Sequence, residues 1–142
     1  MEPKQFTFFI LLWMLLFQSG CFTYRNVTGK KGHFRELSKG DIIELTVPFE
    51  FIDNKGTDII RPEGWDYPYC GLYENIVGQL ESGDRIKFLG AYEFEVYMSP
   101  VRLSENGRII NGQFKGRKVS LHLLGKAKTD GINCYRIVSN SD

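Results

Sequence analysis

The sequence predicts an all-β domain, a small barrel or sandwich of about six to eight strands after an N-terminal targeting segment. Two observations lead to this prediction. The 15 glycines divide the chain into short segments, and apolar residues alternate with polar ones between them, with the period typical of half-buried strands. No segment has a convincing amphipathic helical pattern, although residues 73–80 have room for one helical turn.

The first strand is expected over residues 41–47, where every second residue is apolar. Pro48 lacks an amide hydrogen, so it predicts a bend or a sheet edge, and the alternation continues through Phe49 and Phe51. Turn residues then predict turns on either side of a short strand: turns at 53–56 and 61–64, and the strand at 57–60.

The clearest strand is expected at residues 85–98, where fourteen residues alternate between apolar and charged or polar types. Most strands have about 3–10 residues, so this one is unusually long. Gly90 lies near its middle and predicts a bend at which the strand passes from one part of the sheet to another.

The remaining third of the chain is expected to form further hairpins. Asn106-Gly107 accepts positive φ at both central positions of a tight turn, so residues 104–107 predict a hairpin turn. Three more strands are expected after it, at residues 108–114, 118–124 and 132–138, with a turn at 128–131. On the strand at 118–124, His122 alternates with apolar residues and is expected to face solvent.

Residues 76–90 (IVGQLESGDRIKFLG) combine a short strand, a glycine-containing turn and an alternating strand. This segment resembles the turn–strand unit of bacterial SH3-like domains. The resemblance implies an SH3-like form of the small barrel, while another barrel, a sandwich and a mixed α+β fold stay open as alternatives.

Charge is distributed unevenly although the net charge is only +1. Residues 41–100 hold twelve acidic and four basic residues, whereas basic residues are in excess at 21–40 and 101–142. One interpretation is that acidic and basic strands pair in the fold; the other is a dipolar domain with one face for a charged partner. The low net charge argues against a nucleic-acid-binding protein that works through bulk positive charge.

The N-terminus is predicted to be a targeting signal. Residues 6–17 (FTFFILLWMLLF) are too short for an ordinary transmembrane helix but have the length of a signal-peptide apolar core. Together with Ser19, Gly20 and Cys21, they resemble a bacterial lipoprotein signal peptide ending in a lipobox; Gln18 departs from its usual aliphatic residue. The resemblance implies acylation of Cys21 and anchoring in a bacterial membrane; with Phe22 following the cysteine, it implies the periplasmic face of the outer membrane if the organism is Gram-negative.

The expected organisation is therefore a signal peptide at residues 1–20, a lipidated basic tether at 21–40 and one all-β domain at 41–142. If Cys21 carries lipid, Cys70 and Cys134 remain as a pair. An oxidising envelope would permit a disulfide between them, and two buried free thiols are the alternative.

Residues 65–73 form the densest aromatic segment, with Trp65, Tyr67, Tyr69 and Tyr73 around one proline. Exposed, rigid aromatic side chains can form a groove for an extended peptide or a glycan. The alternative is a loop whose aromatic side chains cover one end of the core.

Catalytic and metal-binding motifs are weak in this sequence. Cys70 or Cys134 would need a histidine base, and His33 is expected in the tether, away from either of them. Glu93 and Glu95 share a strand face at about 7 Å, a separation that occurs in glycosidases. No closely spaced ligand pair predicts a metal site, no cofactor motif is present, and a basic cluster at 115–118 is typical of a solvated turn.

The sequence thus favours a lipid-anchored bacterial envelope protein with a non-catalytic binding or scaffold domain, whose partner would be an envelope protein, a peptide or a glycan. Three alternatives stay open: a small barrel for an apolar ligand, an envelope hydrolase that uses Cys70 or the acidic pair, and a soluble secreted toxin-like or inhibitor domain if Cys21 carries no lipid.

Overall fold

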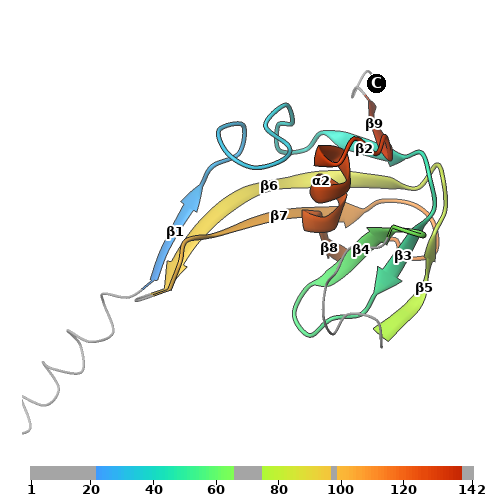
Figure 1. Ribbon diagram of the computed structural model, residues 1–142, viewed down its shortest axis with the longest axis horizontal. Helices are drawn as coiled ribbons and strands as arrows, with labels where there is room; N and C mark the ends of the chain where they lie inside the picture. Colours follow the sequence, from blue (N-terminus) through green and yellow to red (C-terminus); the bar gives the residue numbers. More distant parts are fainter. Residues whose placement is uncertain (1–21, 66–74, 97–98, 139–142) are drawn as a thin grey trace, which may run out of the picture.

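A computed structural model describes residues 22–65, 75–96 and 99–138 (Figure 1). In these residues nine strands form one sheet, and a single short helix packs beside it. The all-β prediction is therefore confirmed. The sheet is open, however, so the expected closed barrel is not formed, and the strand number exceeds the expected range by one.

Eight strands follow one another across the sheet, and a ninth, β1, pairs with β6 outside this path. Their order is β5 (Ile76–Leu80), β3 (Phe49–Ile52), β4 (Asp58–Pro62), β8 (Lys118–Ser120), β7 (Arg102–Ile109), β6 (Arg85–Val96), β2 (Ile42–Leu45) and β9 (Tyr135–Val138), with β1 at Phe22–Asn26. Among the described strands, β4 and β8 are parallel and the other pairs are antiparallel.

The long strand β6 bends where the sequence predicts it. Gly90 has a φ of 116°, and the pairing of β6 with β7 shifts register between Phe88 and Gly90. Before this bulge β6 pairs with β2, and after it β6 pairs with β1. Because only glycine adopts this φ without strain, Gly90 allows β6 to bend. The strand therefore belongs to two parts of the sheet.

Residues 76–90 form the expected strand, turn and strand. β5 ends at Leu80, a turn follows with Gly83 at a φ of 96°, and β6 begins at Arg85. The two strands do not pair with each other, since β5 pairs with β3.

The hairpin turn expected at residues 104–107 is wrong. These residues lie inside β7, and Asn106 and Gly107 pair with both β6 and β8. A Cβ on Gly107 would lie 2.4 Å from Cγ2 of Ile86, so the glycine serves close packing rather than a turn.

The strand expected at residues 118–124 is also wrong beyond Ser120. β8 ends there, and helix α2 (His122–Thr129) begins two residues later. The alternation covers too few positions to exclude a helix, whereas Leu124 and Ala127 face the core at helical spacing. Lys126 and Lys128 in the last turn and Gly131 after it are typical of a helix end.

The tether expected over residues 21–40 is corrected for residues 22–40, which belong to the fold. β1 pairs along its full length with β6, and the loops after it bury Val27, Phe34 and Leu37. Phe34 lies 6.0 Å from Phe88, ring centre to ring centre, inside the core. Residues 27–40 contain only three apolar residues among polar residues and glycines, and these show no periodicity, so the sequence pattern resembles a linker.

Candidate functional site

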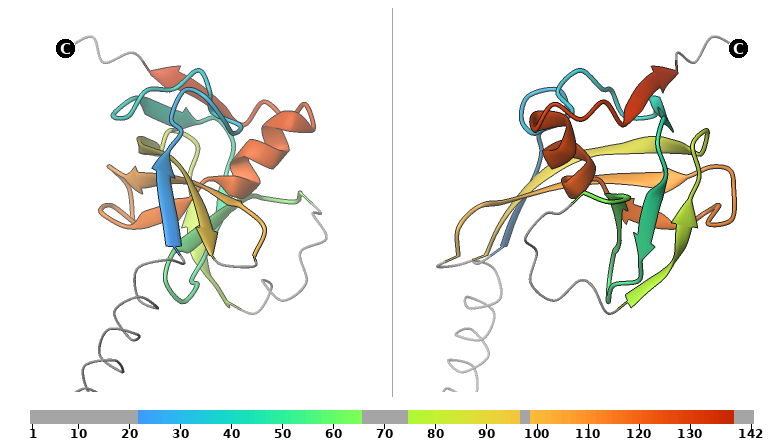
Figure 2. Two further views of the ribbon diagram at one scale, coloured as in Figure 1. Left: turned by 90° about the vertical axis from the view of Figure 1, so that its left-hand side faces the viewer. Right: turned by 45° about the vertical axis from the view of Figure 1, so that its right-hand side comes forward.

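Two regions of the sheet differ in shape and surface. The first region, which we call the arm, consists of β1, residues 92–96 of β6, and residues 99–104, which include the start of β7. The second region, the body, is the rest of the described chain. Figure 2 shows the ends of the three strands side by side, projecting from the body. The register pairs Phe22 with Val96, Tyr24 with Phe94, and Phe94 with Arg102.

Exposed apolar side chains are concentrated in the arm and at the ends of the sheet. In the described ranges the large apolar residues that are most exposed are Tyr24, Ile76, Val77, Val96, Val101, Leu103 and Ile137. Four of them belong to the arm, and the others lie on β5 and β9, the two end strands. Sequence reasoning missed all of these positions, because a strand pattern does not show which strand lies at an edge.

The arm is held rigidly at its base. Tyr24 stacks on Tyr92 with ring centroids 5.0 Å apart, and Thr28 Oγ1 accepts a hydrogen bond from the Ala91 amide at 3.0 Å. Lys31 forms an ion pair of 2.7 Å with Glu93. The strand that follows Cys21 directly is thus fixed to the remainder of the sheet.

The predicted acidic pair lies in the arm. Glu93 and Glu95 pair with Arg25 and Thr23 of β1, and the two carboxylates border a hollow of about 170 Å³. Arg25 and Lys31 line the same hollow, so basic groups stand beside both acids. Acidic and basic side chains that stand together in this way are typical of a solvated surface.

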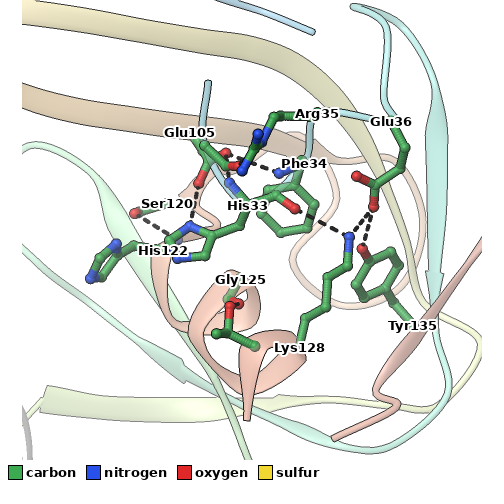
Figure 3. A network of polar contacts seen from close by, with 12 residues as sticks. His33, Phe34, Arg35, Glu36, Glu105, Ser120, His122, Gly125, Lys128 and Tyr135 are labelled. Atoms are coloured by element: carbon green, nitrogen blue, oxygen red, sulfur yellow. Dashed lines mark hydrogen bonds and ion pairs between the residues drawn. The ribbon is translucent and has the colours of Figure 1, made fainter. Parts of the chain in front are cut away.

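A buried carboxylate on β7 connects this strand to the loop that follows β1 (Figure 3). Glu105 is only 3% exposed. Its Oε1 accepts hydrogen bonds from the amides of His33 and Phe34 at 2.7 and 3.2 Å, and its Oε2 lies 2.8 Å from Nδ1 of His33. With an ionised carboxylate, which can only accept, Nδ1 of His33 would be the donor of this contact.

His33 therefore lies in a carboxylate–histidine pair, the arrangement that orients a catalytic base. The sequence had placed this histidine in a tether and Glu105 in a turn. The ring of His33 packs against the backbone of α2, since a Cβ on Gly125 would lie 2.5 Å from Cγ of His33. The pair thus joins three segments, and its packing is that of a structural connection.

His122 lies beside this pair and is half-buried, not solvent-facing as expected. Its ring centre is 5.9 Å from that of His33. Burial lowers the pKa of His122, and the nearby His33 and Lys126 lower it further, while Glu105 acts in the opposite direction. The imidazole is therefore kept neutral over a wider pH range.

A second polar cluster connects the loop after β1 to α2 and β9 (Figure 3). Lys128 of α2 donates to Glu36 and, at 3.1 Å, to the carbonyl of His33, and Tyr135 donates to Glu36 at 3.0 Å. Burial raises the pKa of Tyr135 to about 12. For Glu36, burial acts to raise the pKa, but the hydrogen bonds from Lys128 and Tyr135 outweigh it and lower the pKa.

Some of the unevenly distributed charges pair in the fold, in the way the first interpretation of the charge pattern proposed. Arg117 and Arg136 of the basic C-terminal part contact Asp58 and Glu44 of the acidic part. Glu44 also accepts a hydrogen bond from Arg85 at 2.9 Å. The hydrogen bonds from Arg85 and Arg136 hold the pKa of Glu44 below its ordinary value. The body thereby neutralises part of its own charge.

Several predicted site residues lie outside the described residues: Cys21, Tyr67, Tyr69, Cys70 and Tyr73. Trp65 is partly buried and packs against the core, which favours the core-covering alternative for this one aromatic residue. Cys134 is a fully buried free thiol, so it forms no disulfide, and burial raises its pKa.

In residues 22–65, 75–96 and 99–138, no cluster of three or more histidine, cysteine, aspartate or glutamate side chains is placed to hold a metal ion. The same part of the chain contains no helix that is both long and apolar enough to cross a bilayer. The chain matches no protein-family model, and no curated protein or solved structure was found to be similar to it.

Proposed function

We propose that this protein is a lipid-anchored protein of a bacterial cell envelope whose all-β domain binds a partner polypeptide without catalysing a reaction. The anchor would be Cys21, after removal of the signal peptide. The signal-like sequence supports the anchor, and the sheet supports the binding function.

The observation that carries the binding function is the position of the exposed apolar side chains. Proteins usually protect the edges of a sheet with charges, prolines or covering segments, because an open edge can pair with another chain. Here Ile76 and Val77 on the end strand β5 are 43% and 54% exposed. An end strand with exposed apolar residues suits β-strand addition, in which backbone hydrogen bonds give affinity and side chains give specificity.

We assign the partner surface to β5 rather than to β9 for two reasons. β5 follows the aromatic segment at 65–73, for which a binding groove is one of the two interpretations of the sequence. It also presents two adjacent apolar residues, whereas β9 presents Ile137 beside Arg136, whose guanidinium is paired with Glu44.

The anchor is tested by labelling cells with a clickable palmitate analogue. The wild-type protein and a Cys70→Ala variant should take up the label, and Cys21→Ala should lose it and accumulate as the uncleaved precursor. The proposal of a lipid anchor is wrong if Cys21→Ala is labelled to the same extent as the wild type.

The binding surface is tested by placing a photo-cross-linking residue at position 77 and, as a matched control, at position 137. Both sites carry exposed apolar residues on end strands. Irradiation of intact cells should give a discrete adduct from position 77 that disappears when Ile76→Asp is added. Equal adducts from both positions, or an adduct that Ile76→Asp leaves unchanged, would contradict the assignment to β5.

A further inference from the structure

We propose that the tip of the arm lies in the lipid headgroup layer of the membrane that holds the anchor, so that the domain stands on the bilayer through three rigid strands instead of a flexible tether. This inference rests on the proposed acylation of Cys21. It goes further by assigning a membrane-contacting surface to residues of the folded domain.

The first argument is the distance along the chain. β1 begins at Phe22, the residue directly after Cys21, and consecutive Cα atoms lie 3.8 Å apart. Phe22 pairs with Val96, and paired Cα atoms of antiparallel strands are about 4.5–5.5 Å apart. The backbone of Val96 therefore lies within about 10 Å of the proposed acylated residue.

The second argument compares this distance with the bilayer. Headgroups add about 5–7 Å to the hydrocarbon core on each side. Acyl chains on Cys21 would reach the hydrocarbon, so Phe22 has to lie at or within the headgroup layer. Because strands pair perpendicular to their own direction, Val96 would lie at a similar depth if the arm stands upright.

The third argument is the chemistry of the arm surface. Val96 and Val101 near the tip are 44% and 52% exposed, and Tyr24 is 61% exposed. The register places Tyr24, Val96 and the exposed Arg102 on one face of the arm. Aromatic, apolar and arginine side chains together suit a lipid–water interface, where rings lie at the headgroup level and guanidinium groups meet phosphates.

The fourth argument is rigidity. Five consecutive residue pairs join β1 to β6, and the Tyr24–Tyr92 stack and the Lys31–Glu93 ion pair lie next to them. A strand held in this way cannot leave the membrane surface without moving the entire sheet. The ion pair also neutralises Glu93, which would otherwise be repelled by anionic lipid.

The experiment uses the full-length lipidated protein purified from membranes and reconstituted in vesicles of phosphatidylethanolamine and phosphatidylglycerol. In a Cys70→Ser background, an environment-sensitive NBD probe is attached through Val101→Cys at the arm. The matched control is Lys115→Cys, which is exposed and follows the opposite end of β7. The eight residues of β7 place its two ends about 20 Å or more apart.

The expected result is a blue-shifted emission at position 101 that lipids with a shallow spin label quench at least twofold. The probe at position 115 should emit as in water and stay unquenched. If both probes emit as in water while intact mass shows acylated Cys21, the arm inference fails and the anchor stands. If Cys21 carries no acyl chain, both proposals fail. A blue shift at 101 without quenching means that a second copy of the chain covers the arm, and it overturns the membrane contact.

Discussion

The arm and the body share the strands β6 and β7, yet the two halves of β6 differ in burial. In the first half of β6, Ile86 and Phe88 are fully buried, whereas Val96 at the far end is 44% exposed. The bulge at Gly90 marks the change, since the body has loops and a helix packed on the sheet and the arm has β1 beside it. The comparison teaches that strand pairing and a few surface side-chain contacts hold the arm, whereas a buried side-chain core holds the body.

The largest contrast is expected between an aromatic residue of each region. Phe34→Ala in the body should destabilise the protein by about 3–5 kcal/mol, because its fully buried ring leaves a cavity. Tyr24→Ala in the arm should cost about 0.5–1.5 kcal/mol, the strength of one aromatic stack. Urea denaturation of both variants measures the difference. A negligible effect of Phe34→Ala would mean that the segment is a tether after all.

The two regions should also differ in how they tolerate loss of a glutamate. Glu105→Ala leaves the amides of His33 and Phe34 without an acceptor in a buried site, which should cost about 3 kcal/mol. Glu93→Ala removes a surface ion pair with Lys31 and should cost less than about 1 kcal/mol. Equal midpoints in urea would show that Glu105 is not the connection between the loop and β7.

A glycine in the body tests how tightly the helix packs. Gly125→Ala would ordinarily stabilise a helix by about 1 kcal/mol. Here the added Cβ would lie 2.5 Å from Cγ of His33 and 2.6 Å from its Cβ, so we expect a net destabilisation of about 1–2 kcal/mol. Lys126→Ala on the same helix is the control and should stay within about 0.5 kcal/mol of wild type. A more stable Gly125→Ala variant would contradict the close contact.

The smallest effect is expected from the acid dependence of stability. Arg85 and Arg136 lower the pKa of Glu44 from the ordinary value of 4.5. The unfolded chain therefore takes up the proton first as the pH falls, so this contribution is complete above about pH 4.5 and is lost below it. Glu44→Gln should flatten the decline in stability below that pH.

Glu95→Gln in the arm is the matched control for this acid profile, since Glu95 is exposed. The stability of the Glu95→Gln variant should decline with falling pH in the same way as that of the wild type. The same midpoints for Glu44→Gln and Glu95→Gln at every pH would show that the arginines do not act on Glu44.

The sequence predicted most strands of the body because a surface sheet with one buried face requires alternation. β2, β3, β4, β6 and β9 lie within or close to the predicted segments. The wrong predictions share one cause, since a local sequence pattern does not show which side chains and strands lie next to it in space. Asn106-Gly107 has turn chemistry, but packing against Ile86 and pairing on both sides keep it in a strand.

The candidate site was less predictable than the fold. His33 and Glu105 are 72 residues apart in sequence and meet at 2.8 Å. Neither residue lies in a motif, and a carboxylate in an apparent turn gives no sign that it is buried. The exposed residues of the arm were equally hidden, because Val96 is part of an alternation that reads the same in a core strand.

By itself the sequence determined the all-β class, the bend at Gly90 and the glycine-rich turns, because period-two alternation and positive φ are local properties of the chain. Tertiary structure decided the rest. It opened the sheet, converted residues 122–129 into a helix and drew residues 22–40 into the fold. These outcomes depend on which distant side chains share a core and which strand lies at an edge, and a linear pattern contains neither piece of information.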